Sequence, residues 1–215
     1  MKKIALFVSI VMFTLTGFAQ NSGKAKSLLD EVYNKVKSYD NIYVDFKYVL
    51  ENKKESIHQE TRGNVTIAGD KYLFNYLGAT KMFDGQKIYT VIPENEEVVI
   101  ESKDAEEEGT ITPSKMLTFY RDGYRYAWDA AKNVKGRQIQ YVKLTPIDSN
   151  SETQTILLGI DAQTKHIYNL IETGKNGTET TITVNSFKTN QPLSKSLFTF
   201  NEAKYEDEGY YIIKN

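Results

Sequence analysis

The chain has 215 residues, of which 40% are hydrophobic and 12% aromatic, with 27 basic and 28 acidic side chains and no cysteine. This charge balance disfavours nucleic acid or an anionic membrane surface as the main partner. The lack of cysteine excludes disulfides, thiol chemistry and thiolate metal sites, so stability must come from a sizeable apolar core.

The first segment has the pattern of a secretory signal peptide. Lys2 and Lys3 precede an apolar or small run from Ile4 to Leu15, and Gly17-Phe18-Ala19 closes it. The run is shorter than the roughly 20 residues that span a bilayer, and small residues occupy the cleavage positions. We expect residues 1–19 to be removed, which takes away two of the 27 basic and none of the 28 acidic residues and leaves a net charge of −3. The alternative, an uncleaved anchor, lacks a stop-transfer pattern after it.

A helix and then a series of strands follow in residues 20–215, which we expect to form a single domain. Apolar residues at three- and four-residue spacing predict an amphipathic helix over 24–39. At Ile42 the period changes to two, which predicts a half-buried strand up to Leu50. Further strands are predicted at 59–67, 72–77, 87–92, 97–100, 124–128, 138–145, 155–160, 166–173 and 180–187.

The connections are too short for crossover helices. Turn-forming pairs such as Gly69-Asp70, Asp84-Gly85 and Lys135-Gly136 separate the strands. They indicate one antiparallel, meandering sheet of roughly ten strands. The segment from Thr112 to Tyr120 interrupts the series, and its Pro near the start predicts a short helix between two halves of the meander.

Several predicted strands are apolar on both faces, so both sides of the sheet need cover. Tyr72, Phe74 and Tyr76 alternate with Leu73 and Leu77, for example, yet only about two helices are predicted. A sheet of this size is expected to curl. The fold class predicted is therefore mainly β (α+β): an incomplete, strongly curved antiparallel β-barrel, with the N-terminal helix and the short central helix as plug or lid.

Such a barrel has two possible interiors. Its aromatic side chains could fill it completely, or it could keep an apolar hollow suited to a ligand that is mostly hydrocarbon. Met116, Leu117 and Phe119, on a segment bordered by Gly109 and Gly123, favour the hollow, because soft apolar side chains on a movable segment suit a lid.

Five short motifs occur in an order that resembles a known family. They are Ile42-Tyr43-Val44-Asp45-Phe46, Gly63-Asn64-Val65-Thr66-Ile67, Leu73-Phe74-Asn75-Tyr76, Phe83-Asp84-Gly85-Gln86-Lys87-Ile88-Tyr89 and Leu197-Phe198-Thr199-Phe200. Together, behind a signal peptide, they resemble the periplasmic carriers of outer-membrane lipoproteins, the LolA-like family. The last motif resembles the family's C-terminal Phe-x-Phe strand.

The resemblance implies a periplasmic, non-enzymatic protein without cofactor, expected to be monomeric. It would carry acylated lipoprotein from an inner-membrane exporter to an outer-membrane acceptor. By the same resemblance, an acyl-chain cavity would be lined by Val65, Ile67, Phe74, Tyr76, Met116 and Leu117. We add Ile88 from the strand pattern and Phe119 from the lid pattern to the predicted cavity residues. A periplasmic regulator that senses lipids or lipoproteins with the same fold is the alternative.

One departure from the family concerns a charged residue. Well-known members carry an Arg-Pro pair where this chain reads Ala68-Gly69-Asp70-Lys71. Because the ammonium of Lys71 cannot copy a guanidinium, we expect either a different control of opening or a relative that carries another lipid.

A carbohydrate-active enzyme that uses Asp84 and Glu94 is the third hypothesis. The acidic run from Asp104 to Glu108 is typical of charged side chains on a solvated loop. His58 and His166 are predicted to lie on the polar faces of strands, and their spacing matches no metal-binding motif. We therefore expect no catalytic and no metal site.

Overall fold

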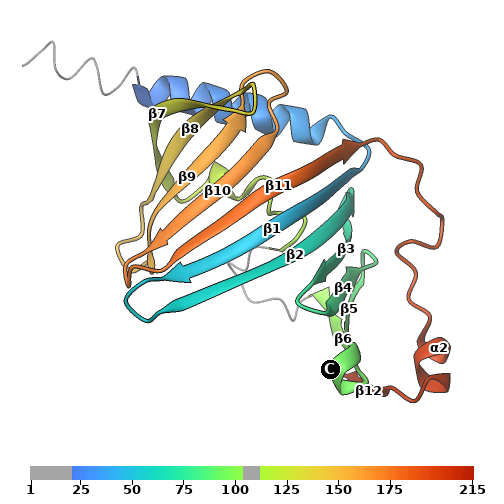
Figure 1. Ribbon diagram of the computed structural model, residues 1–215. Coiled ribbons are helices and arrows are strands. Elements are labelled where there is room, and N and C mark those ends of the chain that lie inside the picture. Colours follow the sequence, from blue (N-terminus) through green and yellow to red (C-terminus); the bar gives the residue numbers. More distant parts are fainter. Residues whose placement is uncertain (1–20, 104–111) are drawn as a thin grey trace, which may run out of the picture.

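The computed structural model of the protein describes residues 21–103 and 112–215. The predicted signal peptide, the acidic run and Gly109 lie outside these ranges. The described chain forms one twelve-stranded sheet with the order β12-β6-β5-β4-β3-β2-β1-β11-β10-β9-β8-β7 (Figure 1).

Helical residues 21–37 precede the sheet. The strands are β1 (Ile42–Asn52), β2 (Ile57–Ala68), β3 (Lys71–Tyr76), β4 (Ala79–Phe83), β5 (Lys87–Ile92), β6 (Glu97–Ser102), β7 (Tyr124–Val134), β8 (Arg137–Pro146), β9 (Thr153–Asp161), β10 (Ile167–Gly174), β11 (Glu179–Thr189) and β12 (Tyr211–Lys214). The short helices are η1 (Pro93–Asn95), η3 (Phe119–Arg121) and α2 (Glu202–Asp207).

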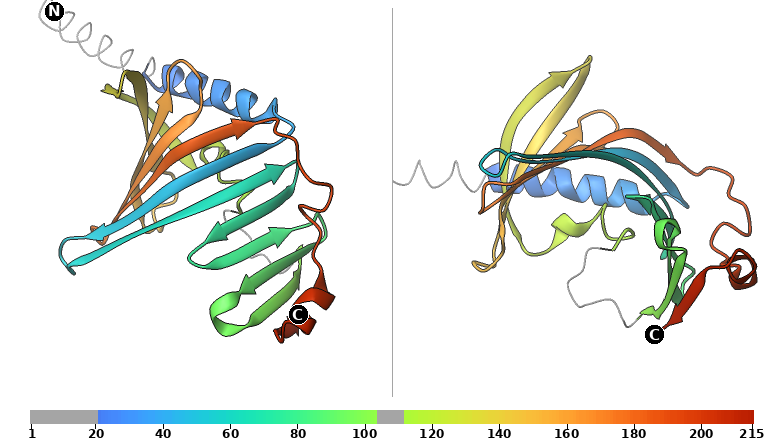
Figure 2. Two further views of the ribbon diagram at one scale, coloured as in Figure 1. Left: turned by 45° about the vertical axis from the view of Figure 1, so that its right-hand side comes forward. Right: turned by 60° about the horizontal axis from the view of Figure 1, so that its bottom comes forward.

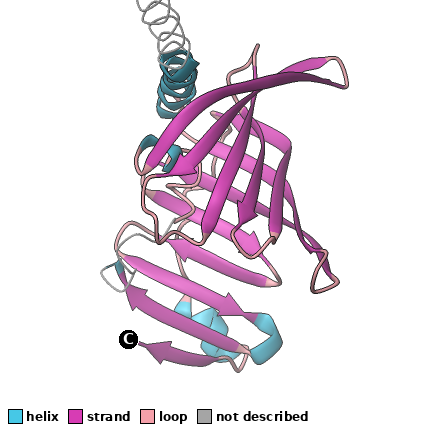
Figure 3. Ribbon diagram, turned by 90° about the vertical axis from the view of Figure 1, so that its left-hand side faces the viewer, coloured by secondary structure: helices cyan, strands magenta, loops and turns pink. Residues whose placement is uncertain are grey.

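The sheet is strongly curved and does not close, as expected. Its edges are β7 and β12, which are not paired with each other. The N-terminal helix and the central segment, residues 112–121, both lie inside the curve (Figure 2), and Figure 3 shows the strands wrapping around this space. The concave face therefore holds the main apolar core.

All ten predicted strands are present, but β4 and β12 were not predicted. β4 follows a two-residue hairpin in which Tyr76 pairs with Ala79. Leu77 and Gly78 both have positive φ, 51° and 77°, which is the geometry of a type I′ turn. The strand predicted over 72–77 includes Leu77, so this turn was not predicted. β12 pairs with β6 in parallel, so the sheet is not antiparallel throughout.

Two shorter elements also differ from the prediction. The central helix is only the single 3-10 turn η3, preceded by turns over residues 113–118. The Leu197-Phe198-Thr199-Phe200 motif forms turns and extended chain instead of the expected strand, so that prediction was wrong. Its Phe200 instead stacks on Tyr89 of β5, with ring centroids 4.4 Å apart, and leads into α2.

The N-terminal helix is attached to the sheet along its apolar stripe. Leu28, Leu29 and Val32 are 5%, 2% and 0% exposed and belong to the same core as the inward residues of β8 and β9. At the helix's C-terminal end the Tyr39 hydroxyl and the His166 Nε2 are hydrogen bonded at 2.8 Å. The helix thus covers one part of the concave face and leaves the rest to the central segment.

Candidate binding cavity

A cavity of about 330 Å³ lies on the concave face, between the sheet and the central segment. Its size falls in the range of small-molecule sites, and its walls are mostly aliphatic and aromatic. The residues that line it are Val44, Phe46, Val65, Ile67, Met116, Leu117, Phe119, Tyr124, Thr153, Ile156, Leu158, Ile167, Leu170, Glu172, Ile182 and Val184.

Strand alternation and register create one wall of the cavity. Val44 of β1 is opposite Val65 of β2, and Phe46 is opposite Gly63, so these residues share the concave face. The Phe46 ring lies over Gly63, because a Cβ there would be 2.5 Å from the Phe46 Cζ. Glycine at this position lets the aromatic ring lie flat against the wall.

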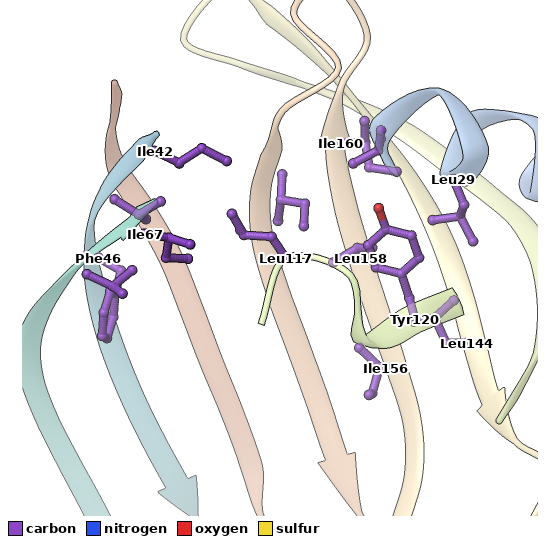
Figure 4. Packing of buried hydrophobic residues seen from close by; sticks show 14 of the residues in the cluster. Leu29, Ile42, Phe46, Ile67, Leu117, Tyr120, Leu144, Ile156, Leu158 and Ile160 are labelled. Carbon is purple, nitrogen blue, oxygen red and sulfur yellow. The ribbon is translucent and has the colours of Figure 1, made fainter. Parts of the chain in front are cut away.

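The central segment covers the cavity with apolar side chains. The Thr112 carbonyl accepts hydrogen bonds from the backbone N–H groups of Lys115 and Met116, which forms a tight turn. Leu117 is 8% exposed and points into the space between β2 and β9 (Figure 4). Phe119 contacts Tyr124 edge-on, with ring centroids 6.0 Å apart.

Five of the eight residues predicted for an acyl-chain site line this cavity: Val65, Ile67, Met116, Leu117 and Phe119. Phe74 and Tyr76 are inward-facing but pack beside the cavity, where both rings lie 6.1 Å from Phe46. Ile88 is 1% exposed and fills the core. Acyl-chain binding by any of the eight residues stays a prediction.

The two interiors considered from the sequence occur in different parts of the concave face. Beneath the N-terminal helix the space is filled by core side chains, among them the fully buried Tyr120 (Figure 4). Burial raises the pKa of Tyr120 far above its usual range. Under Met116 and Leu117 the space is open. The aromatic residues therefore fill only part of the curved sheet.

The second half of the meander contributes a wall of the cavity that was not predicted from the sequence. β9, β10 and β11 supply Ile156, Leu158, Ile167, Leu170, Ile182 and Val184. The alternation of Ile156 and Leu158 indicated an apolar strand face in the sequence. The pairing of β1 with β11, which brings these strands to the cavity, could not be predicted from this alternation.

The cavity has one polar end. The Thr153 hydroxyl donates a hydrogen bond to Glu172 Oε1 at 2.6 Å. Burial raises the pKa of the Tyr124 phenol, and the negative charge of Glu172 adds to this rise. The other described residues that line the cavity are apolar.

Asp84, which was considered as a catalytic carboxylate, stabilises a turn, and Lys71 lies close to the same turn. Asp84 accepts hydrogen bonds from the N–H groups of Gln86 and Lys87 and from the Tyr89 hydroxyl, which fixes the β4–β5 corner. Lys71 lies near this corner, since its charge acts on Asp84, and it is not among the residues that line the cavity.

In the part of the chain that the structure describes, neither histidine lies in a group of potential metal ligands. His58 is exposed beside Glu51, and His166 stacks on Phe187 just before β10. Within residues 21–103 and 112–215 no group of three or more His, Cys, Asp or Glu side chains is placed to hold a metal ion. In the same ranges, no helix combines the length and hydropathy needed to cross a bilayer.

A curled, open β-sheet with an apolar cavity beneath a covering segment is the architecture of a LolA-like binding protein. The chain belongs to the family of the outer membrane lipoprotein carrier protein LolA, whose model matches residues 37–201. No curated protein is similar enough in sequence to be counted as a relative.

Two solved structures with TM-scores above 0.5 share the fold at low sequence identity, and a third is similar at a lower TM-score. A conserved protein from Thermus thermophilus is 9% identical with a TM-score of 0.56, over 89% of this chain and 99% of its own. LprF from Mycobacterium bovis is 11% identical with a TM-score of 0.51, over 81% of this chain and 96% of its own. The LolA superfamily protein NE2245 from Nitrosomonas europaea is 12% identical, with a TM-score of 0.41 over 82% and 97%.

Proposed function

We propose that this protein is a periplasmic carrier that binds the acyl chains of lipoproteins in the concave cavity. It would move these lipoproteins from the inner to the outer membrane. The observation that carries the proposal is the open apolar space under Met116 and Leu117, in a chain that belongs to the LolA family. The expected partners are an inner-membrane exporter and an outer-membrane acceptor.

The carrier would work by burial. Each methylene group removed from water contributes about 0.8 kcal/mol, so a cavity that holds acyl chains makes an insoluble cargo diffusible. The central segment covers the cavity through few side chains, chiefly Met116, Leu117 and Phe119. Its displacement would admit longer chains than the closed cavity holds. Delivery then needs an acceptor that offers the chains an equal or better apolar environment.

The proposal includes no catalytic step. Asp84 is engaged in the β4–β5 corner, and Glu94 lies on the one-turn helix η1, outside the residues that line the cavity. A carrier is therefore expected to keep its activity when Glu94 is replaced by glutamine. A glycosidase that used Glu94 would lose turnover.

The test is a transfer assay between inner-membrane vesicles that present a fluorescent acylated lipoprotein and outer-membrane vesicles. Val184→Trp places a large ring in the cavity and should abolish transfer. Asn185→Trp is the matched control, because Asn185 is exposed and its side chain hydrogen bonds to Asp45 on the opposite face. It should transfer at the wild-type rate.

Native mass spectrometry of the protein purified from its own periplasm identifies the cargo. A lipoprotein adduct that Val184→Trp lacks supports the carrier. A protein that takes up lipoprotein but never passes it to acceptor vesicles would instead be a lipid- or lipoprotein-sensing regulator. A protein that takes up neither lipoprotein nor lipid refutes the proposal.

A further inference from the structure

Among the described residues that line the cavity, only Glu172 carries a formal charge. The others are aliphatic, aromatic or neutral polar. A carboxylate in an otherwise apolar cavity is a feature that acyl-chain binding alone does not require.

The position of Glu172 defines one end of the cavity. Leu170 and Glu172 are two residues apart on β10 and share a face, and an irregularity in the β9–β10 pairing lets Ile167 face the same way. Ile167 follows His166, which is hydrogen bonded to Tyr39 just after the N-terminal helix. At a rise of about 3.3 Å per residue, Glu172 lies roughly 16 Å further along the strand, at the end of the cavity away from that helix.

The carboxylate has hydrogen-bonding neighbours, but no cation of the described chain forms an ion pair with it. Its Oε1 accepts from Thr153, and its charge acts on the Tyr124 phenol. Of the ion pairs formed within residues 21–103 and 112–215, none includes Glu172. The negative charge at this end of the cavity is therefore not compensated by an ion pair within the part of the chain that the structure describes.

Ligand entry would remove water from this carboxylate. A buried charge is unfavourable unless it is paired, so an alcohol or anionic head group would leave Glu172 uncompensated, whereas an ammonium would pair with it. We propose that the cavity selects amphiphiles whose polar end carries a primary ammonium, with Glu172 as its counter-ion and Thr153 orienting the carboxylate. This inference rests on the proposed acyl-chain binding and names the ligand's head group.

Two sources could supply this chemistry. One is a lipid with an ethanolamine head group, and the other is the free α-amine of a diacylated lipopeptide. Both present a primary ammonium next to acyl chains, so both fit a cavity that is apolar along β10 and acidic at one end.

The experiment compares affinities by displacement of a fluorescent fatty-acid probe from the full mature chain. Dodecylamine is compared with dodecanol, lysophosphatidylethanolamine with lysophosphatidylglycerol, and a diacylated lipopeptide with its N-acetylated form. The wild type should prefer the ammonium member of the first pair by about tenfold, as expected for a charge-assisted hydrogen bond. The second and third pairs identify the natural source.

Glu172→Gln keeps an acceptor for Thr153 and removes the charge, so it should lose the preference for dodecylamine. Glu179→Gln removes an exposed carboxylate from β11 outside the cavity and should retain the preference. Thermal unfolding checks that both variants are folded. If the wild type binds every ligand without preference, or if Glu172→Gln keeps the preference, the inference is wrong while the carrier proposal stands. If the wild type binds none of the ligands, the carrier proposal itself fails.

Discussion

At the scale of single residues, Gly63 controls the shape of the cavity wall. A Cβ at this position would be 2.5 Å from the Phe46 Cζ and 2.8 Å from the Asn75 carbonyl oxygen. We predict that Gly63→Ala lowers the free energy of unfolding by about 1–3 kcal/mol, because the ring and strand β3 must both move. Urea denaturation measures the change.

The control for Gly63→Ala is Gly23→Ala in the N-terminal helix. A Cβ there has nothing within 4 Å, and alanine is the better helix former, so this variant should be neutral or slightly more stable. Equal stability of Gly63→Ala and the wild type would contradict the packing described for Phe46.

Asp161 provides a pH-dependent contribution to stability. Its carboxylate is buried, and burial acts to raise its pKa, but the N–H groups of Thr164 and Gln163 and the Arg137 guanidinium outweigh burial and lower the pKa. A lowered pKa in the folded state stabilises the protein above the unfolded value, near pH 4, and this contribution is lost as pH falls further.

We predict that Asp161→Asn lowers the free energy of unfolding by about 1–2 kcal/mol at pH 7, because the pair with the half-exposed Arg137 is lost. The difference from the wild type should be smaller at pH 3, because below the unfolded pKa the stabilisation from the ionised carboxylate decreases as pH falls toward the lower folded pKa. Denaturation at the two pH values measures this. A difference that stays constant would show that the charge of Asp161 does not contribute.

At the scale of elements, the C-terminal segment forms a second apolar cluster. Phe200 stacks between Tyr89 and Tyr205, and Tyr205 contacts Tyr210 at a centroid distance of 5.1 Å. These rings pack in one cluster with Val91, Val98 and Ile100 of the sheet. The strand β12, which follows α2, pairs with the otherwise free edge of β6 (Figure 2). The C-terminal segment therefore protects one edge of the open sheet from pairing with another chain.

We predict that Tyr205→Ala costs about 2–4 kcal/mol, since it removes two aromatic contacts from this cluster. Tyr211→Ala is the matched control, because Tyr211 is 71% exposed and should change stability by less than about 0.5 kcal/mol. Light scattering during mild heating should also show earlier aggregation of Tyr205→Ala. Identical behaviour of the two variants would mean that the cluster does not hold α2 in place.

At the scale of the whole molecule, a ligand that binds only the folded protein must stabilise it. At a free ligand concentration of about 100 times Kd, the gain is about 2.7 kcal/mol, which corresponds to roughly 5–10 °C in Tm for a chain of this size. We predict this shift for the wild type with an acylated ligand and none for Val184→Trp. Differential scanning calorimetry measures both, and an equal shift in the two proteins would place binding outside the cavity.

Ten of the twelve strands, most turns and the curvature could be predicted from the amino-acid sequence. Alternation such as Val44 and Phe46 depends only on neighbours along the chain, and apolar residues on both faces required a sheet that curls around its own cover. The family motifs pointed to the same fold. The strand predicted from Leu197-Phe198-Thr199-Phe200 is absent. Phe200 stacks on Tyr89 of β5 instead, and this contact between residues far apart in the chain is not visible in the local sequence pattern.

Which of the inward-facing residues line the cavity became clear from the three-dimensional packing and not from the sequence. Alternation assigns Phe74 and Ile88 to the concave face, but whether a side chain there meets a cavity or another side chain depends on elements distant in sequence. The helix and Tyr120 fill one part, and the pairing of β1 with β11 brings β10, with Glu172, to the other. Packing between such distant segments is set by the whole folded chain, because each contact fixes the volume left for the next.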